Sequence, residues 1–293
     1  MIKLLILLGV VGVSLSAPLI RFSTAPSMVL VLYRVAMASV LLLPFELSKN
    51  RAELKGLQRR DVLLCLLSGL FLGLHFSCYF EALRYTSIAS AVVLVDTEVF
   101  FVAFLILLLF RERIPGKAWL GILIAFLGSV LIAWSDAGSG ANILLGDAIA
   151  LAGAACMAGY TVIGKACRKR ISTTTYTFLV YVSASLTVLA ILLCTKKPVL
   201  GYEPVNWLTA LGMAVFCTLL GHSVFSWGLK YESAAFLSIV KLLEPVFASL
   251  LGILLFREIP KVTVALGGCT VIVGVIIYTY FSEKSTDQQK GVL

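Results

Sequence analysis

Ten apolar runs, each about 20 residues long, alternate with short polar segments along almost the whole chain. A helix needs about 20 apolar residues to cross the hydrocarbon core of a bilayer, and it satisfies its own backbone hydrogen bonds there. Ten such helices leave too little chain for a separate soluble domain. The sequence therefore predicts an all-α integral membrane protein with ten transmembrane helices, at residues 2–20, 27–46, 61–83, 88–110, 116–134, 145–166, 174–194, 207–228, 233–256 and 262–281.

Composition supports a membrane protein and narrows the partners. The chain is 60% hydrophobic and only 13% charged, whereas a soluble domain carries about 25% charged residues. The net charge of +9 does not indicate nucleic-acid binding, because no water-facing domain carries the charge as a patch. The seven cysteines form no CxxC pair and indicate neither a disulfide framework nor a metal site. We expect the lipid bilayer and a small-molecule substrate as partners and no cofactor, and a homodimer stays an open alternative.

Lysine and arginine are distributed unequally over the two sides of the predicted membrane. Sixteen of the 24 lie on the side that holds both chain ends, and cytoplasmic loops carry the excess of these residues. We therefore expect a multi-pass protein of the cell (plasma or inner) membrane with both termini cytoplasmic, although Lys196 and Lys197 then lie outside. Residues 3–17 imitate a cleavable signal peptide, but Pro18 and the hydrophobicity that resumes at once favour a first span.

The chain repeats itself with an offset of 146 residues. Glu98 coincides with Glu244, and the sequence LLFRE occurs both at 108–112 and at 254–258. Because each copy has five spans, the second copy enters the membrane from the opposite side, so the repeats have inverted topology. The predicted organisation is a first five-helix repeat (1–134), an extracytoplasmic link (135–146), a second five-helix repeat (147–281) and a disordered cytoplasmic tail (282–293).

Several short sequences resemble the drug/metabolite transporter superfamily, specifically its EamA-type members with ten helices. They are Tyr33-Arg34, ALRYTS (82–87), WGLKY (227–231), EPVF (244–247) and the LLFRE repeats. The resemblance covers nearly the whole chain and implies a carrier for small metabolites, often exported amino acids or related compounds. Two positions depart from the family pattern. Val99 stands where many relatives have proline, and GVSLS (12–16) replaces a Trp-Gly-Ser element, so the substrate does not transfer.

Four ionisable residues are predicted near the bilayer midplane: Asp96 and Glu98 in the fourth span, and Lys241 and Glu244 in the ninth. Each costs roughly 2.5–3.5 kcal/mol to insert there, so each needs a partner or a function. They are interpreted either as a substrate or proton site or as a structural network between helices. Lys241 and Glu244 share a helix face, and Pro245 frees the carbonyl of Lys241. This turn suits a zwitterionic or carboxylate-bearing substrate, unless the two side chains simply neutralise each other.

Histidine and arginine add further polar groups to the predicted spans. His75 and His222 occupy nearly equivalent places in the two repeats, and each could relay protons or bond a neighbouring helix. Arg34 could bind a carboxylate, but we favour a structural pairing with Asp96 or Glu98.

Aromatic residues, prolines and glycines complete the set of candidates. Tyr79, Tyr160 and Trp227 could line a cavity or serve as packing and interfacial anchors. Pro18 should loosen the first span as Pro245 loosens the ninth. Glycines in the fifth and tenth spans are expected to permit close helix packing, namely Gly121, Gly128, Gly267, Gly268 and Gly274.

The leading hypothesis is a secondary transporter, specifically an exporter of small metabolites such as amino acids, with alternating access between the two repeats. A facilitative uniporter of the same substrates is the alternative within this class. A membrane scaffold or receptor would not require midplane charges. An intramembrane enzyme would need a nucleophile–base set or a metal cluster such as HExxH, and no catalytic residues are predicted. The chain has no GxxxxGK[ST] sequence for ATP binding.

Overall fold

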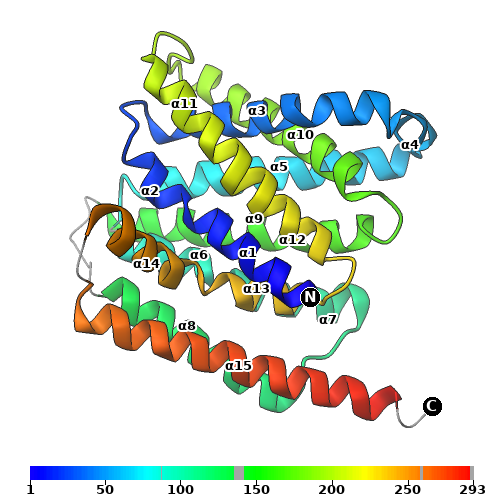
Figure 1. Cartoon of the computed structure of the whole chain (residues 1–293), viewed down its shortest axis with the longest axis vertical. Helices are drawn as coiled ribbons and strands as arrows, with labels where there is room; N and C mark the ends of the chain where they lie inside the picture. Colours follow the sequence, from blue (N-terminus) through cyan, green and yellow to red (C-terminus); the bar gives the residue numbers. More distant parts are fainter. Residues whose placement is uncertain (87, 135–141, 258–259, 291–293) are drawn as a thin grey trace.

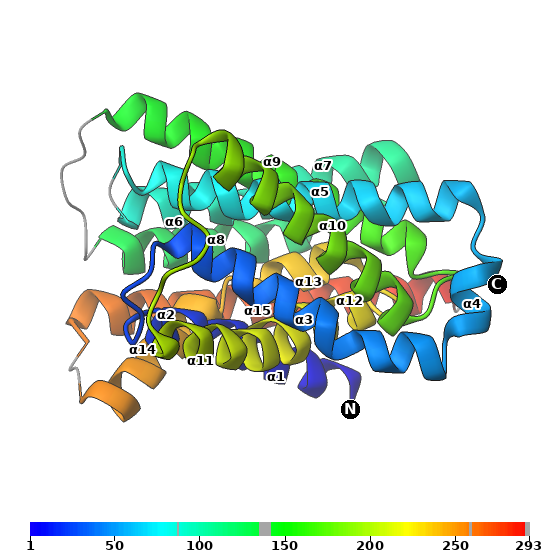
Figure 2. The same cartoon turned by 90° about the horizontal axis from the view of Figure 1, so that it is seen from above.

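The computed structural model describes residues 1–86, 88–134, 142–257 and 260–290, which form a bundle of helices without strands (Figures 1 and 2). Ten of its helical segments are long and apolar enough to cross a membrane, which confirms the predicted number of spans. Ser139 in the predicted link and Glu258 of the second LLFRE sequence lie outside the described residues. Both chain ends lie at the same end of the bundle, here called the terminal end, and the opposite end is called the far end.

The first half supplies five spans, two of them interrupted. The longest loop between the spans contains one short helix, α4. In chain order the elements are α1 (Ile2–Ser14), α2 (Ser16–Ile20), α3 (Ser27–Ser48), α4 (Arg51–Gly56), α5 (Arg59–Ala82), α6 (Ile88–Asp96), α7 (Glu98–Phe110) and α8 (Gly116–Trp134).

The second half supplies the other five spans. Two of its helices begin at side-chain caps: the side chain of Asn142 accepts a hydrogen bond from the Leu145 amide, and Ser233 accepts one from the Phe236 amide. The elements are α9 (Ile143–Cys167), α10 (Thr173–Cys194), α11 (Pro204–Gly212), the π-helix η1 (Met213–His222), α12 (Ser223–Gly228), α13 (Ala234–Lys241), α14 (Glu244–Phe256) and α15 (Val262–Lys290).

Helix α15 continues beyond the predicted end of the tenth span. The sequence led us to expect a disordered tail from residue 282, but the helix runs to Lys290. Residues 282–290 contain neither glycine nor proline, so no residue in that stretch stops a helix that has already begun.

The fourth and ninth spans have the same architecture at positions 146 residues apart. Helices α7 and α14 each have 13 residues and begin at Glu98 and Glu244. Each ends at an arginine in the left-handed conformation, Arg111 with φ 56° and Arg257 with φ 57°. This agreement fits the predicted inverted repeat.

The fifth and tenth spans, α8 and α15, lie side by side along their length (Figures 1 and 2). A Cβ atom built at Gly128 would lie 2.6 Å from the amide nitrogen of Val271, and one at Gly274 would lie 2.3 Å from that of Ala125. The two backbones are therefore in direct contact, which only glycine permits at these positions. The expected packing role of these glycines is confirmed, except that a Cβ at Gly268 would meet its nearest neighbour only at 3.6 Å.

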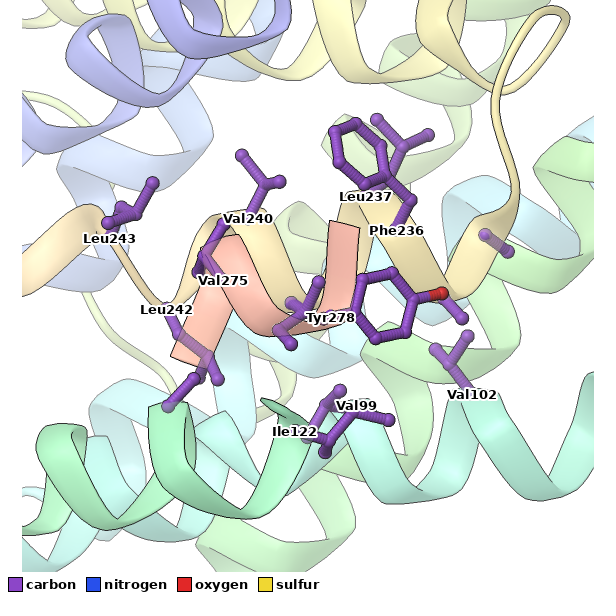
Figure 3. Packing of buried hydrophobic residues seen from close by; sticks show 14 of the residues in the cluster. Val99, Val102, Ile122, Phe236, Leu237, Val240, Leu242, Leu243, Val275 and Tyr278 are labelled. Atoms are coloured by element: carbon purple, nitrogen blue, oxygen red, sulfur yellow. The ribbon is translucent and has the colours of Figure 1, made fainter. Parts of the chain in front are cut away.

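Apolar packing divides into two main clusters. One joins α1, α7, α8, α12, α13 and α15, and the other joins α3, α5, α10, α11 and η1, while α9 contributes to both. Figure 3 shows part of the first cluster, where Val240 and Leu242 lie near the interruption of the ninth span and Val99 and Ile122 lie across from them. The polar residues of the spans are drawn from helices of both clusters.

Candidate functional site

Two spans are broken at the level of the predicted midplane charges. In the fourth span the amide of Thr97 bonds the carbonyl of Leu94, and in the ninth the amide of Leu243 bonds that of Val240. Both are i to i−3 bonds of a tight turn that ends one half-helix and starts the next. The expected break at Pro245 is therefore present, and the first span is also interrupted, at Leu15 just before Pro18. The break at Thr97 was not expected, because no proline follows it.

An ion pair joins the two broken spans. The Nζ atom of Lys241, at the end of α13, lies 3.0 Å from Oε1 of Glu98, at the start of α7. The side chains are 13% and 7% exposed, so the ion pair is almost completely buried inside the protein. Lys241 and Glu244 were predicted to share one helix face, but Leu242 and Leu243 interrupt the helix and leave them on different half-helices. The alternative, in which the two side chains neutralise each other, is also not found, because Lys241 pairs with Glu98. The lysine reaches the other half of the molecule instead.

The remaining two carboxylates of the site have weaker partners. Within the described residues, the Glu244 side chain makes no hydrogen bond and no ion pair, although Lys241 and Arg34 are close enough to act on it electrostatically. Its backbone carbonyl accepts a hydrogen bond of 3.1 Å from the Ser14 hydroxyl of α1. Asp96 accepts a hydrogen bond from the Ser129 hydroxyl of α8. Glu244 thus keeps its full capacity to accept hydrogen bonds.

Arg34 lies buried in α3, on the η1 side of the site. Its Nε atom donates to the hydroxyl of Thr218 and one terminal nitrogen donates to that of Ser16, both at 3.1 Å. Its guanidinium also stacks over the Phe76 ring, 4.8 Å from the centroid. We expected a pairing with Asp96 or Glu98, but the hydrogen bonds of Arg34 go to neutral hydroxyl groups, so its positive charge is not neutralised by contact.

The two histidines are both buried but differ in their bonding. Nδ1 of His75 lies 3.0 Å from the carbonyl oxygen of Gly153 on α9. Nδ1 of His222 is buried and finds no hydrogen-bond partner among the described residues. The Phe76 ring lies between them, 5.3 Å from His75 and 5.6 Å from His222 by ring centroids. Only one of the two equivalent histidines therefore has the structural bond that we considered as an alternative.

Of the three aromatic candidates, two belong to the site. The hydroxyl of Tyr160 hydrogen-bonds that of Ser226 at 2.9 Å, and its ring lies 6.4 Å from that of His222. Tyr79 is close enough to Glu244 and Asp96 for electrostatic interaction. Trp227 instead packs against Tyr231, with 4.8 Å between ring centroids, just beyond the end of α12.

A cavity of about 510 Å³ lies towards the far end, between α2, α14 and the start of α15. Pro18, which follows the interruption of the first span, lies on its wall. So does Ser249, little more than one helical turn after Glu244. The full lining is Ala17, Pro18, Arg21, Ala248, Ser249, Gly252, Phe256, Pro260, Lys261 and Val264. A volume of this size is in the range that small-molecule sites occupy.

Charged and polar contacts lie at the terminal end, some between the halves and some within the second half. Lys165 of α9 pairs with Glu112, which follows α7. The buried Arg168 donates to the backbone carbonyl of Ser226 at 3.0 Å and to the Thr173 hydroxyl at 2.6 Å.

The helix α4 is tied into the same end. The carboxylate of Glu53 accepts hydrogen bonds from the Ser172 amide and the Thr175 hydroxyl. Burial opposes the charged form of Glu53, but these hydrogen bonds hold its pKa below the ordinary value.

Sequence reasoning did not identify the neutral hydroxyl residues of the site. Ser14, Ser129, Thr218 and Ser226 each bond a candidate residue or its backbone. Serine and threonine are common inside transmembrane helices, where they usually bond their own backbone, so their presence carries no signal. The π-helix η1 that contributes Thr218 and His222 was likewise unexpected, and π-helical segments are frequent at functional sites.

The model of the EamA-like transporter family matches residues 1–134 and 144–280. The chain belongs to this family. Together with the ten apolar helices, this makes it a multi-pass membrane transporter, as the sequence resemblance predicted. The interrupted fourth and ninth spans and their Lys241–Glu98 ion pair are accordingly features of an EamA-like transporter.

Three comparisons place this EamA-like transporter among known proteins. It is 27% identical over 254 residues to the pseudopaline exporter CntI of Pseudomonas aeruginosa, covering 87% of this chain and 86% of the exporter. It is 26% identical over 258 residues to an uncharacterized transporter of Clostridium kluyveri, covering 86% and 83% of the two chains. A crystal structure at 18% identity superposes with a TM-score of 0.80 over 95% of this chain and 98% of the other, which shows the fold alone.

Proposed function

We propose that this transporter exports small metabolites that carry both an amino and a carboxylate group, such as amino acids and related compounds. The observation that carries the proposal is the charge balance of the midplane site. Asp96, Glu98 and Glu244 contribute three carboxylates, and Lys241 and Arg34 contribute two cations. With neutral histidines, the ionised site has one negative charge in excess.

An uncompensated charge in a low-dielectric site is costly, so the site needs one further positive charge. Among the residues that the structure describes, the Glu244 side chain has no bonding partner, so the added charge belongs beside it. A proton on Glu244 neutralises the excess negative charge in one step of the transport cycle. The ammonium group of a substrate neutralises it in another step. The substrate carboxylate then lies towards the positive charge of Arg34 or Lys241. Exchange of these two occupants at one carboxylate couples substrate export to proton entry.

The proposed direction of transport rests on the orientation of the two ends of the bundle and on the similarity to an exporter. We place the terminal end and both chain termini in the cytoplasm, because the excess of lysine and arginine lies there. The cavity at the far end then faces outward, and the contacts of Lys165 with Glu112 and of Glu53 with Ser172 join the two halves at the cytoplasmic side. The similarity to an exporter supports outward movement. Labelling of Ser139→Cys, in a variant without native cysteines, tests the orientation, and labelling only in permeabilised cells would refute it.

The substrate class is tested by competition in proteoliposomes. Efflux of radiolabelled amino acids from overexpressing cells identifies a transported one, and its N-acetyl and methyl-ester derivatives are then offered as competitors. We expect both derivatives to compete at least about tenfold more weakly, because each lacks one of the two charged contacts. Equal competition by the N-acetyl derivative would refute recognition of the amine by Glu244.

The coupling is tested with a pH-sensitive dye inside the same vesicles. An outward gradient of the amino acid should drive protons inward, and an imposed pH gradient should accelerate efflux. Movement of the amino acid without any proton flux would identify a uniporter instead.

A further inference from the structure

A second, much smaller cavity borders Lys241. It has a volume of about 10 Å³ and is enclosed by α9, η1, α12 and α13. Its lining combines five residues with polar side chains and three apolar ones, namely Tyr160, Thr161, His222, Ser226, Lys241, Phe225, Leu229 and Leu237. Apolar cavities stay empty, but a polar cavity that holds about one probe sphere accommodates a single water molecule with two to four polar partners.

Two polar atoms at this cavity have no partner. Nδ1 of His222 and Oγ1 of Thr161 are the two buried side-chain atoms within the described ranges that make no hydrogen bond. Their residues are 8% and 3% exposed. Buried polar atoms are almost always bonded to protein or to ordered water, and here both of the unbonded ones belong to residues of a single cavity. A single water molecule within hydrogen-bond distance of both atoms would satisfy them.

The cavity also lies between the midplane charges and the terminal end. On one side Lys241 pairs with Glu98. On the other side Tyr160 bonds Ser226, whose carbonyl accepts a hydrogen bond from Arg168 near the end of α9. The cavity at the far end shares none of these residues. We propose that this small cavity binds a water molecule between His222 and Thr161. We further propose that this water is part of a proton route between the terminal end and the midplane charges, which include Glu244 and the Lys241–Glu98 pair, and that this route is separate from the far-end cavity.

The charges around His222 define its role in this route. Arg34 on α3, His75 on α5 and Lys241 on α13 all act on it electrostatically, and Tyr160 faces it from α9. A proton held on His222 beside two permanent cations is unfavourable, so the histidine stays neutral and passes protons rather than storing them. A neutral imidazole donates through one nitrogen and accepts through the other, which suits it to orient the water. The proton route rests on the proposed proton coupling, whereas the water site does not.

The water site is tested first, without any substrate. Full-length protein in lipid nanodiscs is exposed to hydroxyl radicals generated in ¹⁸O-labelled water, and the labelled side chains are located by mass spectrometry. We expect labelling in the segment with Tyr160 and Thr161 despite its burial. Thr161→Val has nearly the same shape but no hydroxyl, and should reduce this labelling about tenfold, the effect of losing one hydrogen bond. Thr161→Ser keeps the hydroxyl and should retain it. No labelling in the natural protein, or equal labelling in Thr161→Val, would overturn the water site.

The proton route is tested by a pH jump followed by infrared spectroscopy of the same samples. Protonation of a buried carboxyl group appears as a carbonyl band, and Glu98→Gln identifies which band belongs to Glu98. We expect the rise of that band to slow in Thr161→Val and to keep its rate in Thr161→Ser. Unchanged rates in Thr161→Val would show that the water is structural and would overturn the proton route. Failure of the transport assays with normal infrared results would count against the proposed transport function alone.

Discussion

The fourth and ninth spans share a backbone but differ in their charges. Both break at the same place in the repeat, and both continue as a 13-residue half-helix that starts with glutamate. With the offset of 146 residues, Lys241 corresponds to Val95, and Asp96 corresponds to Leu242. One half therefore contributes a cation at the break and the other contributes an extra anion. As a result, Glu98 is paired and Glu244 is not, so a symmetric scaffold holds an asymmetric site.

The largest effect is expected when the cation is removed from the ninth span. Lys241→Met leaves Glu98 buried without its partner, which should destabilise the protein by about 3–5 kcal/mol and abolish transport. Adding Glu98→Gln removes the unpaired charge and should restore most of the stability. Thermal unfolding in detergent measures the stability, and transport in vesicles measures the function. Full transport by the double variant would show that the pair is only a structural link between the halves.

The unpaired glutamate should affect function rather than stability. Glu244→Gln should weaken substrate affinity about 10- to 100-fold, which corresponds to the free energy of one hydrogen bond to a charged group. It should also remove the response of transport to a pH gradient. Its unfolding free energy should change by no more than about 0.5 kcal/mol. Glu244→Asp keeps the charge and serves as the control. A large loss of stability in Glu244→Gln would indicate that this carboxylate is as structural as Glu98.

Substitutions at the contact between α8 and α15 should lower the stability equally, whether they are made in the first or in the second half. Gly128 and Gly274 are repeat counterparts, and each is in backbone contact with the other helix. Gly128→Ala and Gly274→Ala should each destabilise the protein by about 1–3 kcal/mol, because the added methyl group forces the helices apart. Gly268→Ala, in which the methyl group has room, is the matched control. A cost in only one of the two variants would contradict the symmetry of this crossing.

The smallest effect is expected at the proline of the ninth span. The fourth span breaks at the equivalent place with Val99 where the ninth has Pro245, so packing alone supports such a break. Pro245→Ala should therefore change stability by less than about 1 kcal/mol and leave transport nearly intact. Loss of transport in this variant would show that the two breaks have different causes.

Much of the fold is contained in local sequence patterns. Length and hydropathy define the ten spans, and the alignment of Glu98 with Glu244 indicates the repeat, because both signals lie in the order of residues and do not depend on how the helices pack. The midplane positions of Asp96, Lys241 and Glu244 follow from the same patterns. The sequence could not show which anion Lys241 selects, because that depends on how two spans of different halves are aligned against each other.

Other features depend on packing in the same way. No proline follows Thr97 that would predict the break there, and the residues of the π-helix η1 have no distinctive composition. Arg34 was assigned to a carboxylate on the assumption that a buried cation requires an anion. Its actual partners, Thr218 and Ser16, are hydroxyl groups brought together by η1 and the interrupted first span.

The glycine contact between α8 and α15 has a mechanical consequence. Where two backbones touch, no layer of side chains lies between the helices that could exchange one set of contacts for another. We therefore expect α8 and α15 to move together as one rigid unit. A change of access must then come from elements that are already divided, such as the half-helices on either side of Thr97 and of Leu242. During transport, α8 and α15 should keep their positions relative to each other, while the half-helices on either side of the two breaks change their relative orientation.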